Sequence, residues 1–268
     1  MISPLAQVHK GAKIGENVTV GPFAVIHGNV VIGEGTVIDS HAVIMPGARI
    51  GKNCKIFPGA VIASIPQDLK FAGEDTTAEV GDNSVIREYV TLNRGTKANW
   101  KTVIGKNCLI MSYVHIGHDS IIGDHVILSG YCGLAGHVTI EDHVIMEGYS
   151  AIQQFIKIGA HAFCAADSKV RKNVPPYVKC AREPLSYIGV NTVGLTRRGF
   201  SPEIIKQIED TYRLLYVKGA SIPTALAQIE AEIPESAEKR HIINFIQEST
   251  NGIMKGPVRV KEAVSAEK

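Results

Sequence analysis

Three histidines lie close together in the segment IMSYVHIGHDSIIGDH, namely His115, His118 and His125. His118 is followed directly by Asp119, and a carboxylate beside an imidazole can fix the tautomer of the ring and support a general base. The same histidines could instead bind a metal or form an ordinary polar surface. The choice depends on which of these side chains the fold brings to one face.

The composition describes a globular chain of one or two domains with a sizeable core. The chain has 268 residues, 45% of them hydrophobic, and 28 Lys and Arg against 26 Asp and Glu give a net charge of +2. This balance does not indicate a nucleic-acid surface. We find neither the apolar stretch of a signal peptide nor an apolar run of about 18 residues, and therefore expect a cytoplasmic protein without a membrane span.

Outside two interruptions, an aliphatic residue recurs at every sixth position from Val8 to Val170, and among these anchors only Met146 and Cys164 depart from Ile, Val or Leu. A small residue usually follows four positions later. A period of six fits neither a helix nor a simple strand, but it fits a solenoid of short strands joined by tight turns. The cysteines of the repeat fall on inward positions, so we expect inert core thiols, and only Cys180 lies outside the repeat.

Two interruptions of the repeat, at residues 64–79 and 94–102, predict loops extruded from the solenoid. Insertions usually gather on one functional side, so a loop that carries Gln67, Asp68 and Lys70 suggests a binding role. The alternative is a solvated surface loop.

After the NVPPY segment at residues 173–177 the repeat stops and a helical pattern follows. We therefore divide the chain into a repeat domain (1–178), a connecting segment (179–200) and a C-terminal helical domain (201–268).

The helical domain begins with the segment SPEIIKQIEDTYRLLYVKG. Ser201 can cap a helix, Pro202 fits its first turn, and the apolar residues form one stripe that ends near Gly219. Further helices are expected near 223–233 and 237–249.

Hexads of this kind resemble those of the hexapeptide-repeat transferases. The resemblance implies a mainly β fold, a left-handed parallel β-helix of triangular cross-section, followed here by the small α-helical domain. Three hexads make one coil in that fold, so residues three hexads apart stack at the strand spacing of about 4.8 Å. Connections between parallel strands are usually right-handed, so a left-handed β-helix is an exception. We expect the left-handed form from the resemblance alone.

Stacking of the coils would place the candidate residues on one outward patch. Its members are His118, Asp119, Gly136, His137 and Gln154, with His115 bordering it across a corner. A neutral imidazole could take the proton of a hydroxyl that attacks a thioester, and a backbone N–H could stabilise the oxyanion. The patch therefore suggests acyl transfer without an acylated residue, and the alternative is an ordinary polar surface.

Two further columns follow from the same stacking. His125, His143 and His161 form a ladder on the next face, and because they lie along a line they do not converge as a tetrahedral metal site requires. Four small residues form another column, namely Ser112, Gly130, Gly148 and Ala166. That column could leave a groove for a linear alkyl chain, or turn geometry could simply favour small residues there.

Five motifs along the chain resemble those of the acyl-ACP:UDP-N-acetylglucosamine O-acyltransferases. They are HIGHD at 115–119, LAGHV at 134–138, QDLKFAGE at 67–74, NVPPYV at 173–178 and GLTRRGFS at 194–201. The resemblance implies transfer of an (R)-3-hydroxyacyl group from acyl carrier protein to the 3-hydroxyl of UDP-N-acetylglucosamine, the first step of lipid A biosynthesis. It also implies a homotrimer with each site between two subunits, and no cofactor beyond the phosphopantetheine of the carrier.

The resemblance assigns a role to each matching residue. His118 matches the general base, Asp119 its orienting carboxylate and Gly136 the oxyanion-hole amide. The substrate-binding positions are Asp68, Lys70, His115, His137, Gln154, Asn191, Arg197 and Arg198. Adjacent arginines also suit a diphosphate on physical grounds.

Ala166 matches the position that measures the acyl chain in these enzymes. A methyl group there predicts a long chain, on the order of 14 to 16 carbons by the length of the groove. Gln153, Asn93 and Val193 differ from the residues common in relatives, and they bear on whether the acceptor is UDP-N-acetylglucosamine or its 3-amino analogue.

Three rival functions remain at this point. One is another hexapeptide acyltransferase that makes an N-acyl or acetyl transfer to a nucleotide sugar. Another is a zinc γ-type carbonic anhydrase in which His118 and His137 would be ligands, and the third is an inactive scaffold.

Overall fold

The computed structural model describes residues 1–218 and 221–256. Gly219 and residues 257–268, which the sequence analysis assigns to the helical domain, lie outside the described residues.

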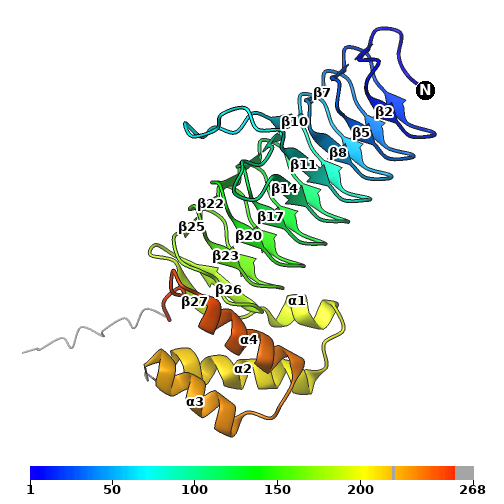
Figure 1. Ribbon diagram of the computed structural model, residues 1–268. Coiled ribbons are helices and arrows are strands. Elements are labelled where there is room, and N and C mark those ends of the chain that lie inside the picture. The colour runs from blue at the N-terminus through cyan, green and yellow to red at the C-terminus, as the bar shows by residue number, and fades with distance from the viewer. Residues whose placement is uncertain (219–220, 257–268) are drawn as a thin grey trace, which may run out of the picture.

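Short strands wind into the expected left-handed parallel β-helix (Figure 1). Each strand of the repeat pairs in parallel with the strand three positions further along the chain, so three strands make one coil. The pairing of β1 (Gln7–Val8) with β4 (Val25–Ile26) is in register, with Val8 opposite Ile26.

The coils build three sheets. The first sheet contains, in spatial order, β1, β4, β7 (Val43–Ile44), β10 (Val61–Ser64), β13 (Thr91–Asn93), β16 (His115–Ile116), β19 (Gly133–Leu134), β22 (Ala151–Ile152) and β25 (Lys169–Val170). The second contains β2 (Lys13–Ile14), β5 (Val31–Ile32), β8 (Ala48–Ile50), β11 (Thr77–Val80), β14 (Lys101–Ile104), β17 (Ile121–Ile122), β20 (Thr139–Ile140) and β23 (Lys157–Ile158). The third contains β27 (Ser186–Val190), β26 (Val178–Ala181), β24 (Phe163–Cys164), β21 (Ile145–Met146), β18 (Ile127–Leu128), β15 (Leu109–Ile110), β12 (Val85–Ile86), β9 (Lys55–Ile56), β6 (Val37–Ile38) and β3 (Thr19–Val20).

The six-residue period arises because each hexad points one aliphatic anchor into the interior of the β-helix. The anchors from Val20 to Val170 are at most 3% exposed. Val8 and Ile14 are only partly buried because the terminal coil has a neighbouring coil on one side only. The core is therefore a stack of aliphatic layers, and the outward side chains are free to vary.

Turns at three corners connect the sheets. The first corner, between the first and second sheets, includes residues 117–119, 135–137 and 153–155; the second includes 123–125, 141–143 and 159–161; the third includes 111–113, 129–131, 147–149 and 165–167. The last residue of each turn has a positive φ, as in Asp119 (59°), His125 (57°) and Tyr131 (62°). This left-handed conformation aims successive side chains of one corner along a common column.

Both extruded loops leave the first corner, between β10 and β11 and between β13 and β14 (Figure 1). They are shorter than expected, at residues 65–76 and 94–100, because the outer residues of both interruptions belong to strands. The Thr76 hydroxyl donates a hydrogen bond to the Gly95 carbonyl (2.5 Å), so the two loops support each other.

Strand pairing continues into the segment that we expect to connect the domains. β26 pairs in parallel with β24 and places Cys180 against Cys164, with the two Sγ atoms 3.2 Å apart. Cys180 is thus a core residue of the β-helix, although the sequence places it outside the repeat. The spacing from Cys164 to Cys180 is shorter than three hexads, so the six-residue period no longer reveals this strand.

Four helices close the C-terminal end of the β-helix: α1 (Thr192–Arg197), α2 (Pro202–Tyr216), α3 (Ile222–Glu232) and α4 (Ala237–Glu248) (Figure 1). The last three confirm the expected helices, and the Ser201 side chain caps α2 as predicted. The Tyr212 hydroxyl donates to the Pro176 carbonyl (2.6 Å), which fixes α2 to the end of the β-helix. Among the described helices, none has the length and apolar character of a membrane span.

Candidate active site

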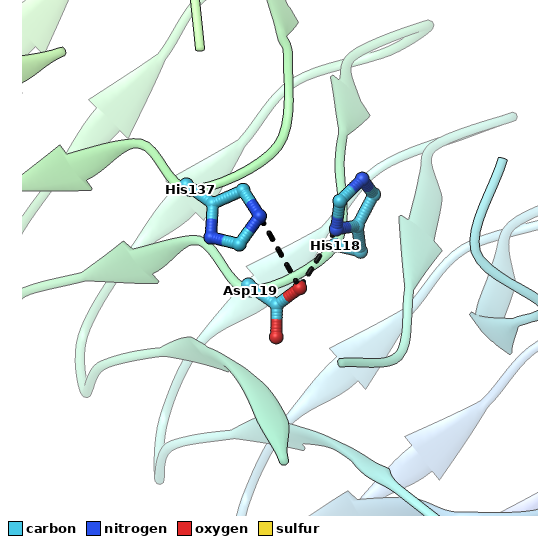
Figure 2. A group of neighbouring side chains, drawn as sticks. All are labelled: His118, Asp119 and His137. Atoms are coloured by element: carbon cyan, nitrogen blue, oxygen red, sulfur yellow. Dashed lines mark hydrogen bonds and ion pairs between the residues drawn. The ribbon is translucent and has the colours of Figure 1, made fainter. Parts of the chain in front are cut away.

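His118 and Asp119 lie in the turn that follows β16 at the first corner (Figure 2). The His118 Nδ1 atom is 2.7 Å from Asp119 Oδ2. The sequence places both residues on an outward patch, but His118 is only 6% exposed and Asp119 only 1%. The loop at 94–100 accounts for the burial of Asp119, because it donates hydrogen bonds to that residue.

The Asp119 carboxylate accepts hydrogen bonds on both oxygens. Oδ1 accepts from the backbone N–H groups of Thr96 (2.9 Å) and Asn99 (3.1 Å), and Oδ2 accepts from the Thr96 hydroxyl (2.7 Å). Burial alone would raise the pKa of the Asp119 carboxyl, but the hydrogen bonds from His118 and Thr96 outweigh it and hold the pKa below its ordinary value. The group is therefore an ionised carboxylate in a nearly dry site.

An ionised carboxylate fixes the tautomer of its histidine partner. Asp119 can only accept, so His118 must carry a proton on Nδ1 to make the 2.7 Å hydrogen bond. The lone pair of Nε2 is then free to take a proton from a substrate. This is the arrangement of a general base with an orienting carboxylate.

His137 approaches the same carboxylate from the next coil (Figure 2). Its Nε2 atom is 3.7 Å from Asp119 Oδ2, and its ring meets that of His118 edge to face at 5.1 Å. Burial lowers the pKa of His137, and the charge of Asp119 partly opposes this effect. Phe155 stacks on the other side of the His137 ring at 4.6 Å, so the ring is held in place.

Gly136 lies directly against the His118 ring. A Cβ atom at this position would be 2.7 Å from both Cε1 and Nε2 of His118, so the ring and any side chain larger than hydrogen exclude each other. Within the described residues, the Gly136 N–H donates to no protein acceptor. A backbone donor beside a basic nitrogen is what an oxyanion hole requires.

Three other predicted residues lie around this corner. The Nδ1 atom of His115 is 2.7 Å from the Thr91 hydroxyl, and burial together with His118 lowers the pKa of His115. Gln154 is exposed at the rim. Asp68 comes close enough from the first loop to influence the pKa of His137, whereas Lys70 is exposed.

At the second corner, His125, His143 and His161 form the expected stacked ladder, with ring separations of 4.6 and 4.8 Å. The Nη2 atom of Arg198 donates to the His143 carbonyl (3.1 Å), and Arg197 is exposed.

Asn191 caps α1 beside this ladder. Its Nδ2 donates to the His161 carbonyl (2.9 Å), and its Oδ1 accepts from the Gly194 N–H (3.3 Å). Both ends of the Asn191 side chain are thus occupied within the chain.

One chain therefore contains two separate groups of predicted site residues. His118 lies at the first corner. In the triangular cross-section of the β-helix, this corner is opposite the third sheet. That sheet is bordered by the second corner, with Arg198, and by the third corner, with Ala166. The structure stacks the small-residue column as expected, since a Cβ on Gly148 would be 3.0 Å from the Gly130 carbonyl oxygen.

The residues that differ from relatives have distinct environments. Gln153 and Val193 are exposed. Asn93 is 2% exposed, and its Nδ2 donates to the Ser64 hydroxyl (2.7 Å) and the Ile65 carbonyl (3.2 Å). Asn93 therefore supports the base of the first loop.

Sequence reasoning missed Thr96 and Asn99, which bind the carboxylate. The available signal was their position in an insertion that leaves the same corner as Asp119, since polar residues there can reach a buried charge. Their backbone N–H groups carry no signal in the sequence.

His118, Asp119 and His137 each have a potential metal-ligand atom within 4.8 Å of the others. Asp119 Oδ2, however, already accepts from both His118 and Thr96. A metal would have to displace these hydrogen bonds, so the geometry favours the proton-transfer dyad.

Comparison with known proteins agrees with this site. Residues 173–254 match the family model described as "Udp N-acetylglucosamine O-acyltransferase; Domain 2", and residues 29–64 and 101–136 match "Bacterial transferase hexapeptide (six repeats)". The protein of Chlorobium phaeobacteroides named acyl-[acyl-carrier-protein]–UDP-N-acetylglucosamine O-acyltransferase is 56% identical over 252 residues, which is 94% of this chain and 96% of that protein. The protein of the same name from Sulfurihydrogenibium sp. is 51% identical and covers 99% of this chain and 98% of its own.

A solved structure shows the same architecture. The UDP-N-acetylglucosamine acyltransferase from Bacteroides fragilis superposes with a TM-score of 0.94 at 47% identity, covering 95% of this chain and all of that chain. The fold and site thus define a hexapeptide-repeat acyltransferase. The chain belongs to the acyl-[acyl-carrier-protein]–UDP-N-acetylglucosamine O-acyltransferase family and is an O-acyltransferase.

Proposed function

We propose that this enzyme transfers an (R)-3-hydroxyacyl group from acyl carrier protein to the 3-hydroxyl of UDP-N-acetylglucosamine, the first step of lipid A biosynthesis. The relatives' names supply the two substrates. The observation that carries the chemistry is the His118–Asp119 dyad, whose Nε2 atom lies against Gly136.

The dyad suits direct transfer from thioester to hydroxyl. His118 Nε2 removes the proton from the sugar hydroxyl as its oxygen attacks the thioester carbonyl, and Asp119 stabilises the resulting imidazolium. The Gly136 N–H stabilises the tetrahedral oxyanion. Collapse of this intermediate breaks the carbon–sulfur bond, and the imidazolium returns the proton to the departing pantetheine thiolate. This scheme needs no acyl-enzyme and no resident metal or cofactor.

We further propose a homotrimer in which each site lies between two subunits. The first corner of one copy would supply His118, and the second and third corners of its neighbour would supply Arg198 and the groove at Ala166. Two buried nitrogens support a nucleotide half-site at the second corner, since Nη1 of Arg198 and Nδ1 of His161 have no partner among the described residues.

An acyl-transfer assay tests the reaction. Purified protein treated with a chelator would receive UDP-N-acetylglucosamine and 3-hydroxyacyl carrier proteins of several lengths, with product identified by mass spectrometry. We expect an ester that alkaline hydrolysis cleaves. An alkali-stable amide formed only from the 3-amino analogue would change the acceptor, and no product with any donor would overturn the proposal.

Subunit mixing tests the shared site. His118→Ala and the double variant Arg197→Ala/Arg198→Ala are each expected to be inactive. Trimers assembled at random from the two should recover about a quarter of wild-type activity, because a site needs one intact half from each neighbour. Complete absence of recovery in verified mixed trimers would place the whole site in one subunit.

A further inference from the structure

The loop at residues 94–100 surrounds the Asp119 carboxylate. It supplies three donors, the N–H and hydroxyl of Thr96 and the N–H of Asn99, at 2.7 to 3.1 Å. The Asn99 side chain also donates to the Asp119 backbone carbonyl (3.0 Å). Thr96 is itself only 6% exposed, so these hydrogen bonds form away from bulk water.

The donors divide between the two carboxylate oxygens of Asp119, and only one of these oxygens also binds His118. Both backbone N–H groups bind Oδ1, whereas the Thr96 hydroxyl and His118 Nδ1 share Oδ2, each at 2.7 Å. The backbone donors therefore fix the plane of the carboxylate. The Thr96 hydroxyl competes with the imidazole for the oxygen that orients it, while His137 Nε2 lies farther from that oxygen, at 3.7 Å.

We propose that Thr96 is a positioning residue for acyl transfer, and that its hydroxyl sets the direction and strength of the hydrogen bond that His118 donates to Asp119. This inference rests on the proposed function of His118 as general base. It assigns to the second loop a part in catalysis separate from substrate binding. It also explains why Asp119 can be 1% exposed and still hold a negative charge.

Removal of the hydroxyl has a defined electrostatic consequence. Oδ2 would lose one donor, and its charge would act more strongly on the remaining partner, the His118 ring. The imidazolium form of His118 would then gain stability, so the acidic limb of kcat/KM should move to higher pH. The titratable groups that face Asp119 in the described chain are His118 and His137, and Asp68 adds its charge near His137.

The neighbouring loop at residues 65–76 supplies a control for an effect on stability alone. The Thr76 hydroxyl donates to the Gly95 carbonyl, so it holds the loop at 94–100 but has no contact with Asp119. Thr76 and Thr96 are both buried. The variants Thr76→Val and Thr96→Val each remove one buried hydroxyl, and only the second alters the dyad.

The experiment compares Thr96→Val, Thr96→Ser and Thr76→Val with wild type across pH. We expect Thr96→Val to lower kcat by about 10- to 100-fold, as loss of an outer partner of a functional histidine does elsewhere, with little change in the KM for UDP-N-acetylglucosamine. In Thr96→Val the acidic limb of the kcat/KM profile should move to higher pH. Thr96→Ser should restore both kcat and the position of this limb, and Thr76→Val should keep the wild-type kcat and pH profile. Equal behaviour of Thr96→Val and Thr76→Val would overturn the inference.

Two further measurements separate the possible failures. An inactive wild type in the same assay would refute the proposed function, whereas active wild type with unchanged Thr96→Val would refute only the role of Thr96. Should Thr96→Val not fold, Thr96→Ala removes the hydroxyl with a smaller side chain. Nitrogen-15 spectra of the wild-type His118 ring should show the proton on Nδ1 near neutral pH, and a proton on Nε2 would contradict the inference without any variant.

Discussion

The first and second corners use histidine in opposite ways. At the second corner the left-handed position is histidine in three successive turns, at His125, His143 and His161, and the rings stack at 4.6 and 4.8 Å. At the first corner the same column reads Asp119, His137 and Phe155. A single carboxylate in the column, with His118 beside it, thus converts a stack of rings into a proton-transfer dyad.

The electrostatic environments of the two corners also differ. Burial, neighbouring histidines and Arg198 lower the pKa of His143 and bring that of His161 to about 4, so these two rings resist protonation. At the first corner, hydrogen bonds hold the pKa of Asp119 low, and its negative charge partly offsets the burial that lowers the pKa of His137. The His118–Asp119 pair therefore marks the first corner as the place that can receive a proton during a reaction.

The largest expected effect comes from removing the base. His118→Ala should reduce the rate of ester formation by about two to four orders of magnitude. The matched change at the other corner, His125→Ala, removes one exposed rung of the ladder and should leave the rate within about twofold, since that ring is not placed for proton transfer. Initial rates at saturating substrates check both, and similar losses in the two variants would break the comparison.

A smaller loss should follow from crowding the dyad. Gly136→Ala places a methyl group 2.7 Å from the His118 ring, which must move. A displacement of this size should cost about 10- to 100-fold in kcat. Gly133→Ala in β19 is the control, because a Cβ there meets no atom within 4 Å, and its kcat should stay near wild type. Retention of full activity by Gly136→Ala would show that His118 does not need its observed position.

The fold and the pairing at the first corner could be predicted because they depend on short-range rules. The six-residue period specified the buried anchors, and the adjacency of His118 and Asp119 implied their contact. The burial of Asp119 could not be predicted, since it comes from backbone donors in an aperiodic loop. α1 was missed because six residues are too few to show an apolar stripe, and β26 because its spacing departs from the repeat.

The low pKa of His161 in the ladder should make the free energy of unfolding depend on pH. The pKa of His161 is about 4 in the folded protein, below the value of about 6.5 in an unfolded chain. Its contribution is therefore complete above about pH 6.5 and is lost as the pH falls towards 4, because the unfolded chain takes up the proton first. We expect a loss on the order of 2 kcal/mol in the free energy of unfolding across this range.

His161→Phe isolates this effect, because phenylalanine can keep the stacking but cannot titrate. Urea unfolding of both proteins at several pH values should show a weaker acid dependence in the variant. An identical pH dependence would mean that the His161 ring is protonated as easily in the folded protein as in the unfolded chain, and the contrast between the corners would lose its electrostatic basis.

The third corner extends the comparison to a stack of tyrosines. Tyr89, Tyr113, Tyr131 and Tyr149 stack there at 4.9 to 5.2 Å and are exposed, and the column of small residues runs beside them. Ala166 is the exposed last member of that column. If an acyl chain lies along it, a larger side chain at this position should end the groove earlier while leaving the dyad unchanged.

Ala166→Met should therefore change which donor is used more than how fast transfer occurs. A methionine side chain spans roughly the length of four methylenes, about one coil spacing of 4.8 Å. We expect the preferred donor to shorten by about four carbons, with kcat for the new best donor near that of wild type. Competition between 3-hydroxyacyl carrier proteins of different lengths measures this shift, and Ala151→Met, on the first sheet away from the column, is the control. Unchanged selectivity in Ala166→Met would mean that the chain lies elsewhere, and the stacked small residues would then reflect turn geometry alone.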